Sequence, residues 1–274
     1  MWPSDSDSLG TYTDTSVRFP ATQMSKNENF IAYRTLTRAD YWWGAYLVSR
    51  DAVTKENLAV VLREWEKRLG DLQDIRKKII QWELPVSDLP IAVPNLQAEF
   101  NDSLATCHVN SVLVAIPNTM QSSFAIPDAT LHEALSEGDF DATLEMTLAD
   151  LESNPESPAT ADFLRWKHGQ FYEGVKRGGG RWWMLRYKGE FVANCGLFRQ
   201  GRTARFREVT THPQWRRRGF ARLLCQLMLA EGFKDSGIEQ VVIIAEHDAS
   251  PERIYKSVGF SRYSFLVALQ WDLK

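Results

Sequence analysis

The chain of 274 residues has few cysteines and no long apolar run. No stretch approaches the roughly 18 apolar residues of a membrane span, and the first 30 residues lack the apolar core of a signal peptide, so we expect a cytoplasmic protein. Three cysteines, Cys107, Cys195 and Cys225, lie far apart without CxxC spacing. This spacing argues against a disulfide framework or a zinc site and fits a reducing compartment.

Basic residues are missing from a long internal stretch. Between Ile79 and Leu164 there is no Lys or Arg, but there are 14 acidic residues. The rest of the chain holds 32 basic and 21 acidic residues and so carries a net charge of 32 − 21 = +11. The acidic stretch is either a solvated face that aids solubility or a surface for a cationic partner. A phosphate-binding cluster is indicated in the basic remainder, where only Glu208 opposes eight arginines: Arg199, Arg202, Arg205, Arg207, Arg216, Arg217, Arg218 and Arg222.

The first 120 residues contain few regular patterns. Residues 1–26 are rich in Ser, Thr and Asp and predict a loose tail. Residues 27–120 are expected to form a first domain, in which Thr54 is the N-cap of a helix with apolar residues at helical spacing. Its predicted strands cover residues 30–36, 41–48 and 111–116, and a linker follows at 118–128.

Residues 121–274 show a more regular pattern and predict a second domain. The predicted helices cover 139–151, 162–175, 218–234 and 251–258, and the predicted strands cover 181–187, 190–198, 203–211, 241–245 and 264–271. The unit from Thr203 to Ala245 is expected to be a right-handed parallel crossover. The pairs Trp42-Trp43 and Trp182-Trp183 fit either an internal duplication or chance in a Trp-rich chain.

The segment from Val209 to Arg222 carries the most specific pattern. It joins a strand, a tight turn, a basic loop and a predicted helix start. Gly219 lets the backbone approach a ligand, and the first N–H groups and the dipole of the helix favour an anion. Together with Arg217 and Arg218, these features predict a diphosphate site, although a basic helix start with solvated arginines has the same composition.

This segment resembles the signature of the GNAT superfamily of acyl-CoA-dependent N-acyltransferases. The signature is Arg or Gln, two residues, Gly, one residue, then Gly or Ala, and here it reads Arg216-Arg-Arg-Gly219-Phe-Ala221. A second signature downstream reads Ile254-Tyr255-Lys-Ser-Val-Gly259-Phe260. The ordered pair of signatures extends the resemblance over about residues 136–274.

The resemblance implies an α+β fold, with a GNAT-type mixed, twisted sheet flanked by helices. Residues 121–274 would then be the catalytic domain. The element order in residues 27–120 is similar to a second, degenerate GNAT-like domain without the signature loop, as in tandem GNAT proteins.

The resemblance also implies how the co-substrate acetyl-CoA is held. Backbone groups of the strand end pair with the pantetheine arm as an added strand, and loop amides hold the pyrophosphate. Asp248 stands where the family often has Asn. The implied cofactor-binding residues are Val209, Thr210, Thr211, Arg216, Arg217, Arg218, Gly219, Phe220, Ala221 and Arg222.

Three residues are candidates for the chemistry. The family often has a Tyr near the thioester sulfur at the position of Tyr255, which either protonates the leaving thiolate or only packs there. An amine must lose a proton before it attacks, and a carboxylate usually takes it. Glu208 and Glu246 are both candidate bases, with an ion pair and a solvated loop position as their alternatives, and His212 is expected to be a turn residue.

We therefore expect an N-acetyltransferase that moves an acetyl group from acetyl-CoA to a primary amine of a cationic small molecule or peptide. We expect no metal, no nucleic acid and no membrane partner, and a homodimer is possible. One alternative is a non-catalytic acyl-CoA-binding sensor or scaffold with the same cofactor site. The other is a nucleic-acid-binding module, against which the pI near 6.0 counts.

Overall fold

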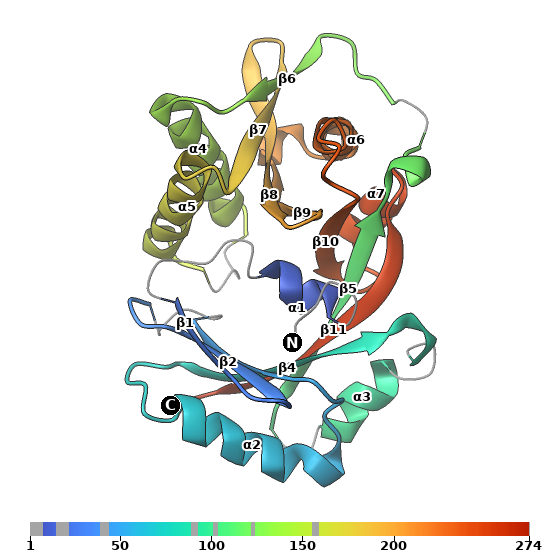
Figure 1. The fold of residues 1–274 in the computed structure, drawn as a ribbon. Coiled ribbons are helices and arrows are strands. Elements are labelled where there is room, and N and C mark those ends of the chain that lie inside the picture. The colour runs from blue at the N-terminus through green and yellow to red at the C-terminus, as the bar shows by residue number, and fades with distance from the viewer. Residues whose placement is uncertain are drawn as a thin grey trace.

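The computed structural model describes residues 8–14, 22–38, 44–88, 93–100, 104–121, 124–154 and 159–273. Its strands form one sheet in the order β1-β2-β3-β4-β11-β5-β10-β9-β8-β7-β6, with helices packed against it (Figure 1). The strands are β1 (Thr22–Lys26), β2 (Phe30–Thr35), β3 (Ala45–Ser49), β4 (Lys77–Pro85), β5 (Thr106–Ala115), β6 (Ala129–Glu133), β7 (Gly180–Tyr187), β8 (Glu190–Gln200), β9 (Thr203–Thr211), β10 (Gln240–Glu246) and β11 (Ser261–Asp272).

The helices differ widely in length. None of those described is both long and apolar enough to cross a membrane. They are α1 (Leu9–Asp14), α2 (Lys55–Leu69), α3 (Val93–Phe100), α4 (Glu137–Glu152), α5 (Ala161–Lys176), α6 (Phe220–Gly232) and α7 (Ser250–Lys256), with short 3₁₀ turns η1 (Val86–Asp88), η3 (Pro117–Thr119) and η4 (Pro213–Trp215).

Strands β5 and β11 interlock the two halves of the chain. The C-terminal strand β11 lies between β4 and β5 and is antiparallel to both, although both belong to the first 120 residues. In turn β5 pairs with β10 of the second half. Each half therefore contributes a strand to the sheet of the other, and the proposed domain division at residues 120 and 121 stays a prediction.

The two faces of the second half carry different helices. Side chains alternate along β7, so Trp182 and Met184 pack with α4 and α5, whereas Trp183 and Leu185 join the core beneath α6. Figure 1 shows α4 and α5 on one side of β7–β9 and α6 on the other. This arrangement leaves the ends of β9 and β10 between two helical layers.

The prediction of a loose tail at residues 1–26 is wrong for the described part of that segment. Residues Leu9–Asp14 form α1, whose Leu9 is fully buried against Val112, Val242 and Leu266, and Thr22–Lys26 form the edge strand β1. The helix packs through Leu9, the partly buried Tyr12 and several polar contacts, so it is too short to show a hydrophobic periodicity in the sequence.

Most predicted elements of the second half are confirmed within a few residues, including the parallel β9–α6–β10 crossover. The prediction for the first half is less complete, because it contains neither β4 nor α3, and β6 begins directly after the predicted linker at 118–128. The predicted strand at 41–48 is observed as Ala45–Ser49, and Trp42 and Trp43 lie outside the described residues.

Candidate active site

A wedge opens between the parallel strands β9 and β10. Among the described residues, β10 pairs with β9 only from Thr203 to Arg205, while β9 continues to Thr211 with β8 as its partner. The backbone of β9 from residue 207 to 211 therefore presents a free edge toward the wedge. Such an edge accepts an extended chain as an added strand.

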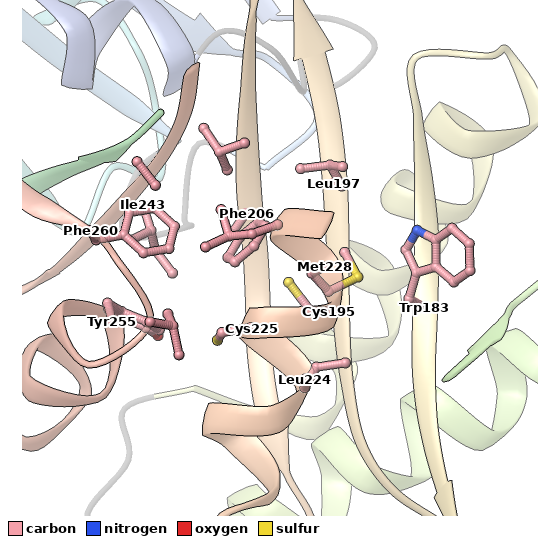
Figure 2. Packing of buried hydrophobic residues seen from close by; sticks show 14 of the residues in the cluster. Trp183, Cys195, Leu197, Phe206, Leu224, Cys225, Met228, Ile243, Tyr255 and Phe260 are labelled. Atoms are coloured by element: carbon pink, nitrogen blue, oxygen red, sulfur yellow. The ribbon is translucent and has the colours of Figure 1, made fainter. Parts of the chain in front are cut away.

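Aromatic and sulfur side chains fill the inner part of the wedge. The ring of Phe260 lies 5.6 Å from that of Phe206 and 6.1 Å from that of Tyr255, measured between centroids. Figure 2 shows Tyr255 of α7 facing Cys225 of α6 within this cluster. The side of the wedge formed by α6 and α7 is therefore apolar.

The loop between β9 and α6 ends in an uncapped helix start. Gly219, the N-cap of α6, has φ of 86°, and Arg217 also lies in the left-handed region with φ of 63°. Among the described residues no side chain caps α6, and the first turn of this helix contains no acidic residue. The first amides of α6 are thus available to an anion.

Three buried polar atoms near this loop have no hydrogen-bond partner among the described residues. They are the Thr211 hydroxyl, Nδ1 of His212 and Nε of Arg222. Buried polar groups are nearly always satisfied in folded proteins, so unpaired groups beside an open strand edge indicate a bound molecule or water. The chain therefore fits a ligand with polar and anionic groups at this position.

The eight clustered arginines separate into two sets. Five form ion pairs with acidic residues from elsewhere in the chain: Arg199 with Asp235, Arg202 with Glu239, Arg205 and Arg207 with Asp14, and Arg216 with Asp150. Arg217, Arg218 and Arg222 have no acidic partner among the described residues. These three, which we call the loop arginines, surround the start of α6.

Aromatic rings hold two of the loop arginines. Arg218 lies over the ring of Trp215, with its guanidinium carbon 4.8 Å from the ring centroid, and Arg222 lies over Phe124 at the same distance. A cation–π contact orients a guanidinium without neutralising its charge. The loop therefore keeps its positive potential.

Phe124 gives Gly219 a role that the sequence did not suggest. A Cβ atom on Gly219 would lie 2.9 Å from the Phe124 ring. The Phe124 backbone also forms two hydrogen bonds with the side chain of Gln226, which fix this segment against α6. Glycine at position 219 is thus required by its left-handed conformation and by Phe124, whatever ligand binds.

Glu208 lies at a β-bulge in the free edge of β9. Thr210 pairs with Asn194 and Arg207 with Gly196, so β9 carries one extra residue opposite β8, and Glu208 has φ of 52°. Its carboxylate lies 2.7 Å from Nζ of Lys167 on α5, and 31% of its side chain remains exposed.

The surroundings of Glu208 favour its ionised form. Burial alone would raise the pKa of Glu208 by removing water from the carboxylate, but the charge and hydrogen bond of Lys167 and the charge of Arg207 lower it below its usual value. The expected ion pair is present, and its partner is a lysine of α5 rather than a neighbouring arginine.

The charge of Glu208 reaches Tyr255, and Glu246 lies at the end of β10. Tyr255 is 7% exposed, and its pKa is raised well above 10 by burial and by the charges of Cys225, Cys195 and Glu208. Glu246 is exposed at the end of β10, where it pairs with Asn110. Alternation along β10 puts Glu246 on the face opposite the cluster that contains Tyr255, which is also the face on which Glu208 meets Lys167.

The comparisons with known proteins agree with this geometry. A family model described as the acetyltransferase (GNAT) domain matches residues 178–262. Residues 178–262 form a GNAT domain. No protein of curated function matches the sequence.

Solved structures with a similar fold extend the likeness to nearly the whole chain. A GCN5-related N-acetyltransferase from Kribbella flavida has a TM-score of 0.63 at 15% identity, covering 93% of this chain and 90% of its own. A functionally unknown protein from Staphylococcus epidermidis has a TM-score of 0.72 at 10% identity, covering 96% and 98%. A tandem GNAT protein from the clavulanic acid biosynthesis pathway has 0.61 at 10%, covering 95% and 87%. At these identities the likeness concerns the fold, which is that of tandem GNAT proteins.

Within the GNAT domain, the predicted cofactor residues contribute in different ways. Phe220 is buried against Tyr187 and Trp215, so only its amide faces the loop, whereas Arg216 joins Asp150 and Ser153 at the end of α4. Their roles as cofactor ligands stay predictions. Sequence reasoning missed Lys167 and Phe124, because a lysine on an amphipathic helix and an aromatic residue in a linker carry no signal of their own.

Proposed function

We propose that this chain transfers an acetyl group from acetyl-CoA to a primary amine in the wedge between β9 and β10. The free edge of β9 from residue 207 to 211 is the observation that carries this proposal, because it ends beside the uncapped start of α6. In the proposed complex, Val209, Thr210 and Thr211 pair through their backbone with the pantetheine arm. The amides of Gly219, Phe220 and Ala221 and the loop arginines hold the pyrophosphate.

Glu208 is the proposed base and Tyr255 the proposed partner of the leaving sulfur. Glu208 accepts a proton from the acceptor ammonium, and the freed nitrogen lone pair forms a bond to the thioester carbonyl carbon. When the C–S bond breaks, its electrons pass to sulfur, which Tyr255 stabilises by donating a hydrogen bond. The attacking nitrogen loses its second proton as the amide forms, and the thiolate takes up one proton, so the products are the acetylated amine and the free thiol of CoA. The raised pKa of Tyr255 keeps its phenol protonated and able to donate this hydrogen bond.

Glu246 remains a second candidate for the base. Its exposed position is consistent with a water-mediated role, but Glu208 is better supported because its charge reaches Tyr255. The cytoplasm is the proposed compartment, since all three cysteines are free thiols.

The experiment is turnover of acetyl-CoA with a panel of amines, measured as release of free CoA. Glu208→Gln keeps the shape of the side chain and is expected to lower kcat by about 10²–10⁴-fold, with CoA binding unchanged. Tyr255→Phe is expected to lower kcat less, because only a hydrogen bond is lost. CoA binding without turnover on any amine would instead support the acyl-CoA sensor.

We also propose a cationic acceptor. Part of the acidic stretch is neutralised, for example Asp150 by Arg216 and Asp162 by Arg38. Asp141 and Glu145 of α4 are exposed and have no ion-pair partner among the described residues, and the charge of Asp141 reaches the buried His168 of α5. These carboxylates would attract an ammonium toward the α4 and α5 side of the sheet.

Salt dependence tests the acceptor class. The acceptor KM is expected to rise with ionic strength, and Asp141→Asn with Glu145→Gln is expected to raise it at low salt. The matched control is Glu173→Gln, which removes an exposed carboxylate that already pairs with Lys176. A preferred acceptor that is neutral or anionic, with a KM indifferent to salt and to these substitutions, would leave the acidic residues as a solubility feature.

A further inference from the structure

The bulge in β9 sends two consecutive side chains to one face of the sheet. Arg207 bonds to α1 through Asp14, and Glu208, the next residue, bonds to Lys167 of α5. Regular alternation would have sent Glu208 to the opposite face, beneath α6. The extra residue at the bulge and the left-handed conformation of Glu208 make this contact with α5 possible.

Lys167 is held in place independently of Glu208. Its ammonium lies 5.8 Å from the centroid of the Phe171 ring, one helical turn further along α5, and only 19% of its side chain is exposed. A lysine restrained by an aromatic ring and a helix backbone loses little freedom when it pairs with a carboxylate. The pair is therefore a fixed feature of the site rather than a solvated surface contact.

We infer that Lys167 is a positioning residue that holds the carboxylate of Glu208 in place beside the free edge of β9. The inference rests on the proposed function, in which Glu208 accepts the proton of the acceptor. A carboxylate in this crowded wedge would be protonated more readily without a nearby cation, and a protonated Glu208 accepts no proton.

Other charged and titratable groups also interact electrostatically with Glu208. Arg207 precedes it on β9 and His168 follows Lys167 on α5, while the charge of Glu208 reaches Cys195 of β8 and Tyr255 of α7 in the cluster beneath α6. Burial lowers the pKa of His168 to about 4, so this residue is neutral near pH 7, and both the thiol and the phenol keep their protons. Arg207 is already paired with Asp14, whereas Lys167 forms the ion pair with Glu208.

The pH dependence of kcat/KM tests the inference. In the parent protein the acidic limb set by Glu208 is expected below about pH 4.5, because Lys167 lowers the pKa of this carboxyl group. Lys167→Met is expected to move that limb upward by about one pH unit or more, whereas Lys167→Arg restores it toward the parent position. Lys176→Met is the matched control, because Lys176 lies on the same helix and pairs with an exposed glutamate.

The outcomes separate this inference from the proposed function. If Glu208→Gln keeps the parent rate, the base is wrong and the inference falls with it. If Glu208→Gln is inactive but Lys167→Met keeps the parent limb, only the role of Lys167 is overturned. If no amine is acetylated, the proposed function fails, and the Glu208 carboxyl is titrated by ¹³C NMR, where an equal pKa in parent and Lys167→Met overturns the coupling.

Discussion

Two parallel strand–helix–strand units, β3–α2–β4 in the first half and β9–α6–β10 in the second, differ at the start of their helices. At α2 the chain satisfies its own N–H groups, since Asn57 accepts from the Thr54 amide and Glu99 accepts from the Lys55 amide. Glu56 adds a carboxylate in the first turn, and its pKa is lowered by a hydrogen bond from Thr54. In the part of the chain that the structure describes, α6 has neither a side-chain cap nor a carboxylate in its first turn, and arginines surround its first amides.

We call the N-terminus of α2 closed, because the chain itself satisfies its amides, and the N-terminus of α6 open, because its amides are accessible to an anion. Carboxylates at α2 occupy the position that a phosphate would take and repel one. The same topology thus serves stability in one half and is suited to ligand binding in the other. The same distinction applies to charged side chains, which are closed when another residue of the chain pairs with them. Substitutions at closed sites should change stability alone, and substitutions at the open start of α6 should change CoA binding alone.

The largest effect on stability is expected at the ion pairs that Arg205 and Arg207 form with Asp14 of α1. Asp14→Ala removes the carboxylate shared by the buried Arg205 and by Arg207, which is expected to lower the free energy of unfolding by about 3 kcal/mol or more. Chemical denaturation measures it, and Asp235→Ala, which frees the exposed Arg199, is the control, with less than about 1 kcal/mol expected. Equal losses in the two variants would contradict the distinction between buried and exposed pairs.

The buried carboxyl group of Glu252 is a second closed site and is expected to make stability depend on pH. Glu252 is 1% exposed; burial would raise its pKa, but hydrogen bonds from Lys256, the Asp248 amide and Arg262 lower it to about 2. Its contribution, up to about 3 kcal/mol, is fully present above the unfolded pKa near 4.5 and is lost as pH falls toward 2. Between pH 2 and 6 the free energy of unfolding should change less with pH for Glu252→Gln than for the parent. Glu173→Gln should leave this pH dependence unchanged.

The open start of α6 gives the sharpest contrast in ligand binding. Replacing Arg217, Arg218 and Arg222 together with alanine is expected to weaken CoA binding by about 100-fold and to remove most of the rise in Tm on adding CoA. Glu56→Gln with Glu99→Gln at α2 is the matched control and should leave the CoA-induced rise unchanged. An unaltered Kd in the triple variant would place the anion elsewhere. Gly219→Glu is less informative, because its side chain would collide with Phe124 whether or not CoA binds.

Local patterns were enough for much of the second half. Helical spacing predicted α4, α5 and α6, and the order of Arg216, Gly219, Tyr255 and Gly259 predicted the family that the comparisons later matched. Glycine signatures and amphipathic periods are properties of neighbouring residues, so one sequence is enough to read them. The absence of lysine and arginine from residues 79 to 164 can likewise be read from the sequence. Which acidic residues of this stretch form ion pairs cannot be read from it.

Tertiary structure alone decided which charged residues form ion pairs and which strands pair with one another. Nothing in the sequence links Asp14 to Arg205 and Arg207, or Lys167 to Glu208, because these pairs join segments far apart in the chain. The exchange of β5 and β11 between the halves is likewise invisible locally, since an apolar strand carries no record of its partner. The sequence by itself determined the signature loop and the elements of the second half. Folding determined which three of the eight arginines have no acidic partner among the described residues, because ion pairing depends on distances that only the assembled sheet sets.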